Sequence, residues 1–256
     1  MTADNQKQLL EDAKLRVEEA KTCLHELKKL FSSFSEKSPC KFFEEIDPQT
    51  SEILLKVCLI QPLPSKIKIE ANNIISHLRS ALDYTACALA IINGKQESAV
   101  YFPSAKNIEE FESKECQSKI QKLSPEAIAF IKSYEPYKGG KGEIFWMLNQ
   151  LWNIGKHRKL VAVGSCSISL MMESIHVKQP SVSILCPSWN FEEESMLLLR
   201  RSPQSEVEYN IKIPLHLGIR DVEFINNREP IVPVFKEAVN AVEKFINDCE
   251  RRFFRK

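Results

Sequence analysis

Two segments of the chain carry side chains whose types and spacing could do chemistry. The first spans residues 72 to 94 and reads NNIISHLRSALDYTACALAIING, with no Lys or Glu at its polar positions. The second spans residues 143 to 160 and reads EIFWMLNQLWNIGKHRKL, with polar positions that are mostly amide and imidazole. Helix faces that meet water usually carry Lys and Glu, which are soluble and favour the helix. Both polar faces are therefore predicted to be covered, each by the other.

If these faces meet, they pool groups that suit a phosphodiester, a nucleotide or another anionic ligand. We predict catalytic roles for Arg79, His157, Tyr84 and Asp83, and substrate-binding roles for His77, Asn73, Asn153 and Lys156. Arg and Lys would bind phosphate oxygens, His would act as general acid or base, and Asn and Tyr would orient the substrate. Because the set holds a single carboxylate, no metal site is expected, and no motif implies a cofactor.

The same side chains also allow a non-catalytic interpretation, in which they form a structural network. Arg79 and Asp83 stand four residues apart, and a lone charge inside a protein is costly, so the two are predicted to be partners. The basic run at 156–159 would suit the C-terminal end of a helix. A closed contact between the two faces would then make a structural network in a non-enzymatic ligand-binding or protein-interaction module, whereas an open contact would make a site.

Apolar periodicity predicts the helices that position these groups. In the first segment one face is predicted to enter the core, and it consists of Ile74, Ile75, Leu78, Ala81, Leu82 and Thr85. A long first helix carries an apolar seam from Leu10 to Phe34, and a similar stripe runs from Phe235 to Phe253. The two seams could pack together within one chain, which we favour, or they could form a homodimer contact.

The remaining elements complete an α+β fold. Residues 51 to 64 are predicted to form a strand, and helices are expected between residues 107 and 135, with Ser124 as an N-cap and Pro125 at the first helical position. The glycine-rich stretch PYKGGKGEIF lacks the spacing of a phosphate-binding loop, and we interpret it as a flexible connector.

Residues 160 to 214 are rich in β-branched residues and turn signals, which predicts an antiparallel β-meander. We therefore expect a single domain over residues 1–256, with a helical part at about 1–160 and 233–256 and a β part at about 160–215. The two long terminal helices and the helices between them would form a bundle.

Composition limits the function classes. The chain has 256 residues and a net charge of +1, so no global field draws it to nucleic acid or to anionic lipid. Its eight cysteines form no C-x-x-C pair, which is typical of a cytoplasmic protein with reduced thiols. No apolar run is long enough to span a membrane, so no membrane association is expected. The basic run ERRFFRK at the end suits the C-terminus of a helix.

The succession HLRSALDYTA, VYFPSA, IKSYEPY and LWNIGKHRKL, spread over residues 70 to 160, resembles a widespread family of functionally uncharacterised bacterial proteins. In that family the matching pieces read approximately NLRSALDHLA, an FP piece, QPY and LxxLxNIDKHR. The resemblance implies kinship and no particular activity.

The R-x4-H pattern of that family is in turn similar to the Arg and His pair of HEPN domains. These are helical bundles that include metal-independent endoribonucleases of defence and toxin systems. Arg79 matches the Arg, but Tyr84 stands where the His would be, and a Tyr with its ordinary pKa near 10 is a poor base at neutral pH. If the resemblance implies RNA cleavage here, His77 or His157 would have to supply the imidazole.

Overall fold

The structure is a computed structural model of the chain. It describes residues 3–157, 163–168, 171–177, 182–184, 189–190, 195–205, 207–212, 215–219 and 230–255. The chain divides into two compact units: a helical unit of Met1–Leu27, Ile69–Val161 and Val232–Lys256, and a β unit of Lys28–Lys68 and Ala162–Ile231. The fold is α+β, as predicted, but the β unit also draws on a stretch of chain near the N-terminus.

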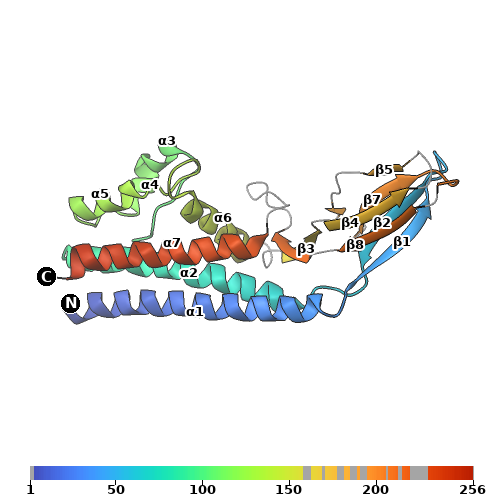
Figure 1. The fold of residues 1–256 in the computed structure, drawn as a ribbon. Helices are drawn as coiled ribbons and strands as arrows, with labels where there is room; N and C mark the ends of the chain where they lie inside the picture. The colour runs from blue at the N-terminus through green and yellow to red at the C-terminus, as the bar shows by residue number, and fades with distance from the viewer. Residues whose placement is uncertain are drawn as a thin grey trace. The chain divides into compact units, whose positions relative to one another are not determined.

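Three long helices frame the helical unit: α1 (Ala3–Ser35), α2 (Ser65–Ile92) and α7 (Ile231–Cys249). They run side by side, with α1 antiparallel to the other two (Figure 1). A short π-helical segment, η1 (Glu250–Phe254), extends α7. Ion pairs of 3.0 Å between Lys14 and Glu250 and of 2.7 Å between Lys21 and Glu243 tie α1 to the C-terminal helix.

The predicted apolar seams meet inside this frame. The buried members on α1 within the helical unit are Leu10, Ala13, Val17, Ala20, Leu24 and Leu27, and those on α7 are Phe235, Ala238, Val242, Phe245 and Cys249. The whole predicted core face of α2, from Ile74 to Thr85, is buried as well. Packing of the two terminal helices within one chain is therefore confirmed, and a homodimer through them stays a prediction.

Four shorter helices follow α2 along the chain: α3 (Ile108–Phe111), α4 (Lys114–Ser118), α5 (Pro125–Ser133) and α6 (Glu143–His157). Of these, α5 and α6 contact α7 through Phe130 and Phe145, whose ring centres lie 5.5 and 6.1 Å from that of Phe245. Side chains of Asn107, Ser113 and Ser124 accept a backbone N–H at the starts of α3, α4 and α5. The predicted cap at Ser124 with Pro125 in the first turn is confirmed. Trp146 of α6 is buried, at 4% exposure.

The β unit is built around a five-stranded sheet. Its strands are β1 (Cys40–Ile46), β2 (Ile53–Leu59), β7 (Ser195–Arg201) and β5 (Val182–Ile184), hydrogen-bonded in that order, with β6 (Trp189–Asn190) also on β7. Two further pairs join β3 (Val163–Ile168) to β9 (Leu215–Ile219) and β4 (Met171–Val177) to β8 (Val207–Lys212). The pairings are antiparallel, as predicted, but the strand order is not that of a simple meander.

The sequence also predicts that no helix spans a membrane and that the cysteines are reduced. Among the helices that the structure describes, none combines the length and the apolar character that a membrane span requires. Six cysteines whose side chains the structure describes are free thiols, and three of them, Cys23, Cys116 and Cys249, are buried. Burial raises the pKa of the Cys249 thiol to about 12, so this thiol stays protonated at neutral pH.

Candidate functional site

Arg79 and Asp83 form the ion pair that their spacing predicts. Nη2 of Arg79 donates to Oδ1 of Asp83 at 2.7 Å and to the carbonyl oxygen of Phe102 at 2.9 Å. The same Oδ1 accepts the backbone N–H of Phe102 at 2.8 Å. The pair thus bonds to both backbone polar groups of Phe102, and this fixes the segment around Phe102 on α2.

This pair is deeply covered. Arg79 is 5% exposed, and burial lowers the pKa of its guanidinium although Asp83 acts in the opposite direction. Burial likewise raises the pKa of Asp83, against the effects of Arg79 and of the Phe102 N–H. The guanidinium carbon lies 5.9 Å from the ring centre of Trp152 on α6. Nε and Nη1 of Arg79 have no hydrogen-bond acceptor within the described part of the chain.

Three segments that are far apart in the sequence therefore meet around one guanidinium. Arg79 comes from HLRSALDYTA, Phe102 from VYFPSA and Trp152 from LWNIGKHRKL. The ring of Phe102 in turn packs on Phe145 at 5.4 Å and on Phe245 at 5.1 Å between ring centres. These contacts are the ones expected of residues that set the packing of a helical core.

His77 and Tyr84 lie on the side of α2 that faces α1, away from the Arg79 pair. Nη1 of Arg16 on α1 donates to Nδ1 of His77 at 3.2 Å, and the Arg16 guanidinium lies 5.8 Å from the Tyr84 ring centre. Burial lowers the pKa of His77, and the positive charge of Arg16 adds to this effect. The structure thus divides the predicted residues of α2 between two sides of the helix.

Of the other predicted residues, Asn73 lies where α2 faces α6. Asn73 lines a hollow of about 320 Å³ together with Ser76 and Trp152, and Asn153 is half-buried on α6. Lys156 and His157 occupy the last turn of α6, but their side chains lie outside the part of the chain that the structure describes. The predicted convergence of His157 with Arg79 accordingly stays a prediction.

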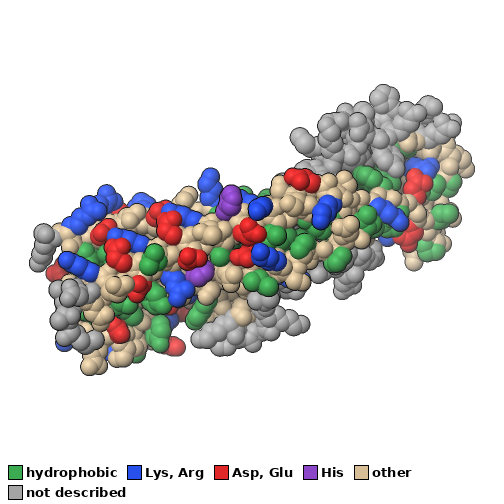
Figure 2. Space-filling model, turned by 90° about the horizontal axis from the view of Figure 1, so that it is seen from below, with side chains coloured by type: hydrophobic (Ala, Val, Ile, Leu, Met, Phe, Trp, Pro, Cys, Tyr) green, Lys and Arg blue, Asp and Glu red, His purple; other side chains and the backbone are tan. Residues whose placement is uncertain are grey.

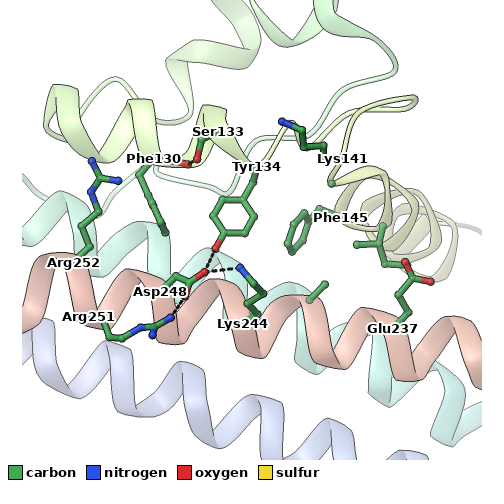
Figure 3. A pocket seen from close by; sticks show the side chains of 13 residues that line it. Phe130, Ser133, Tyr134, Lys141, Phe145, Glu237, Lys244, Asp248, Arg251 and Arg252 are labelled. Carbon is green, nitrogen blue, oxygen red and sulfur yellow. Dashed lines mark hydrogen bonds and ion pairs between the residues drawn. The ribbon is translucent and has the colours of Figure 1, made fainter.

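A larger pocket, of about 660 Å³, lies between α5, the turn that enters α6, and α7 (Figure 3). Its aromatic wall consists of Phe130, Tyr134 and Phe145. Its charged side chains are Lys141, Lys244, Arg251, Arg252, Glu237 and Asp248, an excess of two positive charges. None of these residues belongs to the set predicted from the sequence.

Asp248 is the polar centre of this pocket. One of its oxygens accepts the hydroxyl of Tyr134 at 2.6 Å and Nζ of Lys244 at 2.7 Å, and Arg251 donates to the other. Hydrogen bonds from Lys244 and Tyr134 lower the pKa of Asp248 to about 2. Burial and Asp248 together raise the pKa of Tyr134, so its hydroxyl remains a donor.

The turn that enters α6 is held by hydrogen bonds to Glu135. The backbone N–H of Gly142 donates to the Glu135 carbonyl at 3.2 Å, and Nζ of Lys141 pairs with the Glu135 carboxylate at 3.0 Å. A Cβ at Gly142 would lie 2.4 Å from the Tyr134 carbonyl oxygen and 2.9 Å from the Phe145 ring. The stretch interpreted as a flexible connector is thus a compact turn, and its glycine allows two walls of the pocket to approach each other.

Two sequence features could have pointed to this pocket. The basic run at the C-terminus supplies Arg251 and Arg252, although a helix-end role explains it equally well. Phe253 of the same run packs on Phe130, at 5.4 Å between ring centres, as a purely structural interpretation of the run would require. The glycines of the turn are the second feature.

Among the described residues, no three His, Cys, Asp or Glu side chains gather as a metal site would need. Comparisons of this chain with protein-family models, with curated proteins and with solved structures give no match.

Proposed function

We propose that this chain is a non-enzymatic ligand-binding module whose ligand enters the pocket between α5, α6 and α7. The observation that carries the proposal is the contrast in accessibility between two sets of polar groups. Arg79 is 5% exposed and already bonded to Asp83 and Phe102, so a phosphate would have to displace these contacts to reach Nη2. The pocket on α7 offers exposed cations beside an aromatic wall.

The size and lining of this pocket support a small ligand. Small-molecule sites typically occupy roughly 300 to 1,000 Å³ and combine apolar walls with a few polar groups. The pocket has about 660 Å³ and the same combination.

On the face of the helical unit that carries α1, acidic and basic side chains are interspersed (Figure 2). Such a face offers a polyanion no continuous positive surface.

Filling the pocket tests the proposal. In the Ala241→Trp variant an indole would occupy the pocket from α7, because Ala241 lines it. The wild type is expected to bind the fluorescent probe anilinonaphthalene sulfonate at one saturable site, and Ala241→Trp is expected to lose that binding. Asn240→Trp is the matched control, since Asn240 is exposed on the same helix outside the pocket lining. Equal binding by Ala241→Trp and the wild type would refute the proposal.

Metal-independent RNA cleavage is the competing proposal, and one observation favours it. Nε and Nη1 of Arg79 are buried donors without an acceptor among the described residues, and a buried guanidinium with free donors can bind phosphate. Cleavage of RNA by the wild type, lost in both Arg79→Ala and His157→Ala while both variants stay folded, would support this function. Equal RNA stability in the presence of all three proteins would exclude it.

A further inference from the structure

We infer that the ligand of the pocket on α7 is a small organic anion that carries an aromatic ring, such as an aryl phosphate or a nucleoside monophosphate. This inference rests on the proposed binding function and gives it a ligand class. It follows from the aromatic rings and the cations that line the same pocket, with Nζ of Lys244 5.5 Å from the ring centre of Tyr134 (Figure 3).

The aromatic wall provides a fixed surface for a planar group. The rings of Tyr134 and Phe145 lie 6.1 Å apart at an interplanar angle of 70°, and both contact Phe245 of α7, at 5.1 and 6.1 Å between ring centres. Phe130 stacks on Phe245 at 5.5 Å. Aromatic rings attract one another in edge-to-face and offset arrangements. A ring in the ligand would extend a cluster that the core already holds in place.

The cations around the pocket can turn toward a ligand. Side chains of Lys141, Lys244 and Arg251 are 79%, 71% and 66% exposed, so each stays hydrated and can exchange its surface ion pair for a ligand at little cost. Lys244 and Arg251 share the single carboxylate of Asp248, which leaves positive charge in excess beside Tyr134. An anion placed there would gain charge-assisted hydrogen bonds without displacing a buried partner.

Neither the anionic group nor the ring of the ligand would by itself contact all of the pocket lining. Inorganic phosphate is far smaller than the cavity of about 660 Å³ and would leave the half-buried ring of Tyr134 uncovered. A neutral ring would contact the aromatic lining but would gain no charge-assisted hydrogen bond from Lys141 or Lys244, which would keep their ion pairs with Glu135 and Asp248. A ligand that joins both parts gains both interactions while losing its translational freedom only once.

Calorimetric titration of the full chain with four probes tests the inference: adenosine monophosphate, phenyl phosphate, adenosine and inorganic phosphate. Both ring-bearing phosphates are expected to bind at least roughly tenfold more tightly than adenosine and than inorganic phosphate. Binding of adenosine monophosphate without phenyl phosphate would assign the site to nucleotides, and equal binding of the two would assign it to aryl anions in general.

Two substitutions locate the charge. Lys244→Ala is expected to weaken the binding of the ring-bearing phosphates about tenfold, and this loss should shrink at high salt. Lys236→Ala is the matched control, because Lys236 is exposed on α7 and does not line the pocket. If adenosine binds as tightly as its monophosphate, or if Lys244→Ala binds like Lys236→Ala, the ligand class is wrong and the binding function stands. If neither the four probes nor the fluorescent sulfonate binds, the binding function fails as well.

Discussion

The helical unit contains two ion pairs with the same sequence spacing and the same length but opposite surroundings. Arg79 and Asp83 on α2, and Lys244 and Asp248 on α7, are both i,i+4 pairs with a distance of 2.7 Å. The Arg79 side chain is 6% exposed, whereas the Lys244 side chain is 71% exposed. The difference lies entirely in what packs on the cation.

The pKa values of the two carboxylates shift in opposite directions. Burial raises the pKa of Asp83, because the loss of water outweighs its bonds to Arg79 and Phe102. Hydrogen bonds from Lys244 and Tyr134 lower the pKa of Asp248 to about 2, because here they outweigh the effect of burial. A spacing of four residues therefore identifies a pair, and the surroundings decide whether the pair stabilises the core or remains available to a ligand.

The largest loss of stability is expected when the buried ion pair is broken. Arg79→Ala should lower the free energy of unfolding by about 3 to 5 kcal/mol, because it leaves the Asp83 carboxylate buried without its cation. Lys244→Ala removes the matching cation at the surface and should cost less than about 1 kcal/mol. Urea denaturation of both variants measures the difference. Equal losses would show that burial does not separate the two pairs.

An intermediate effect is expected at the turn that borders the pocket. Gly142→Ala places a Cβ 2.4 Å from the Tyr134 carbonyl oxygen, and the backbone must move to relieve that contact. We expect a loss of about 1 to 3 kcal/mol in unfolding free energy and weaker binding of phenyl phosphate, since Tyr134 and Phe145 would shift apart. Unchanged stability and unchanged affinity would mean that the turn does not set the width of the pocket.

The smallest expected effect is the pH dependence of stability that Asp248 causes. The pKa of Asp248 is about 2 in the folded chain and about 3.9 when unfolded, so its ionised form stabilises the fold above about pH 4. That contribution falls away as the pH drops toward about 2. Asp248→Asn should therefore be less stable than the wild type at neutral pH, by about 1 kcal/mol or less, and the gap should close in acid. Thermal denaturation at several pH values measures the gap, and a gap that persists at about pH 2 would contradict this assignment.

Local sequence patterns predicted much of the helical unit. The core face of α2, the cap at Ser124 and the Arg79–Asp83 pair each depend on residues within a few positions of one another. The edge strand β1 was missed because most of its side chains are exposed and it shows no alternation of burial. The pairing of β3 with β9 joins strands about fifty residues apart, which no local pattern specifies.

The pocket on α7 was missed for the same reason. Tyr134 and Asp248 are 114 positions apart in the sequence and meet only when α5 packs on α7. The exposure of Lys244 likewise depends on which elements pack around it. Its spacing from Asp248 could not have predicted this exposure, because the buried Arg79–Asp83 pair has the same spacing. The chemistry of Arg79 was correctly identified as that of a paired charge, but its accessibility depended on Phe102 and Trp152, which lie on other segments.

Mapping of the backbone amide shifts of the labelled chain during titration with adenosine monophosphate tests the central claim most directly. We expect the largest changes at Tyr134, Lys141 and Lys244, which border the pocket on α7. Changes centred instead on Asn73, Ser76 and Trp152, around the hollow between α2 and α6, would contradict the account and move the site to the Arg79 side of the molecule.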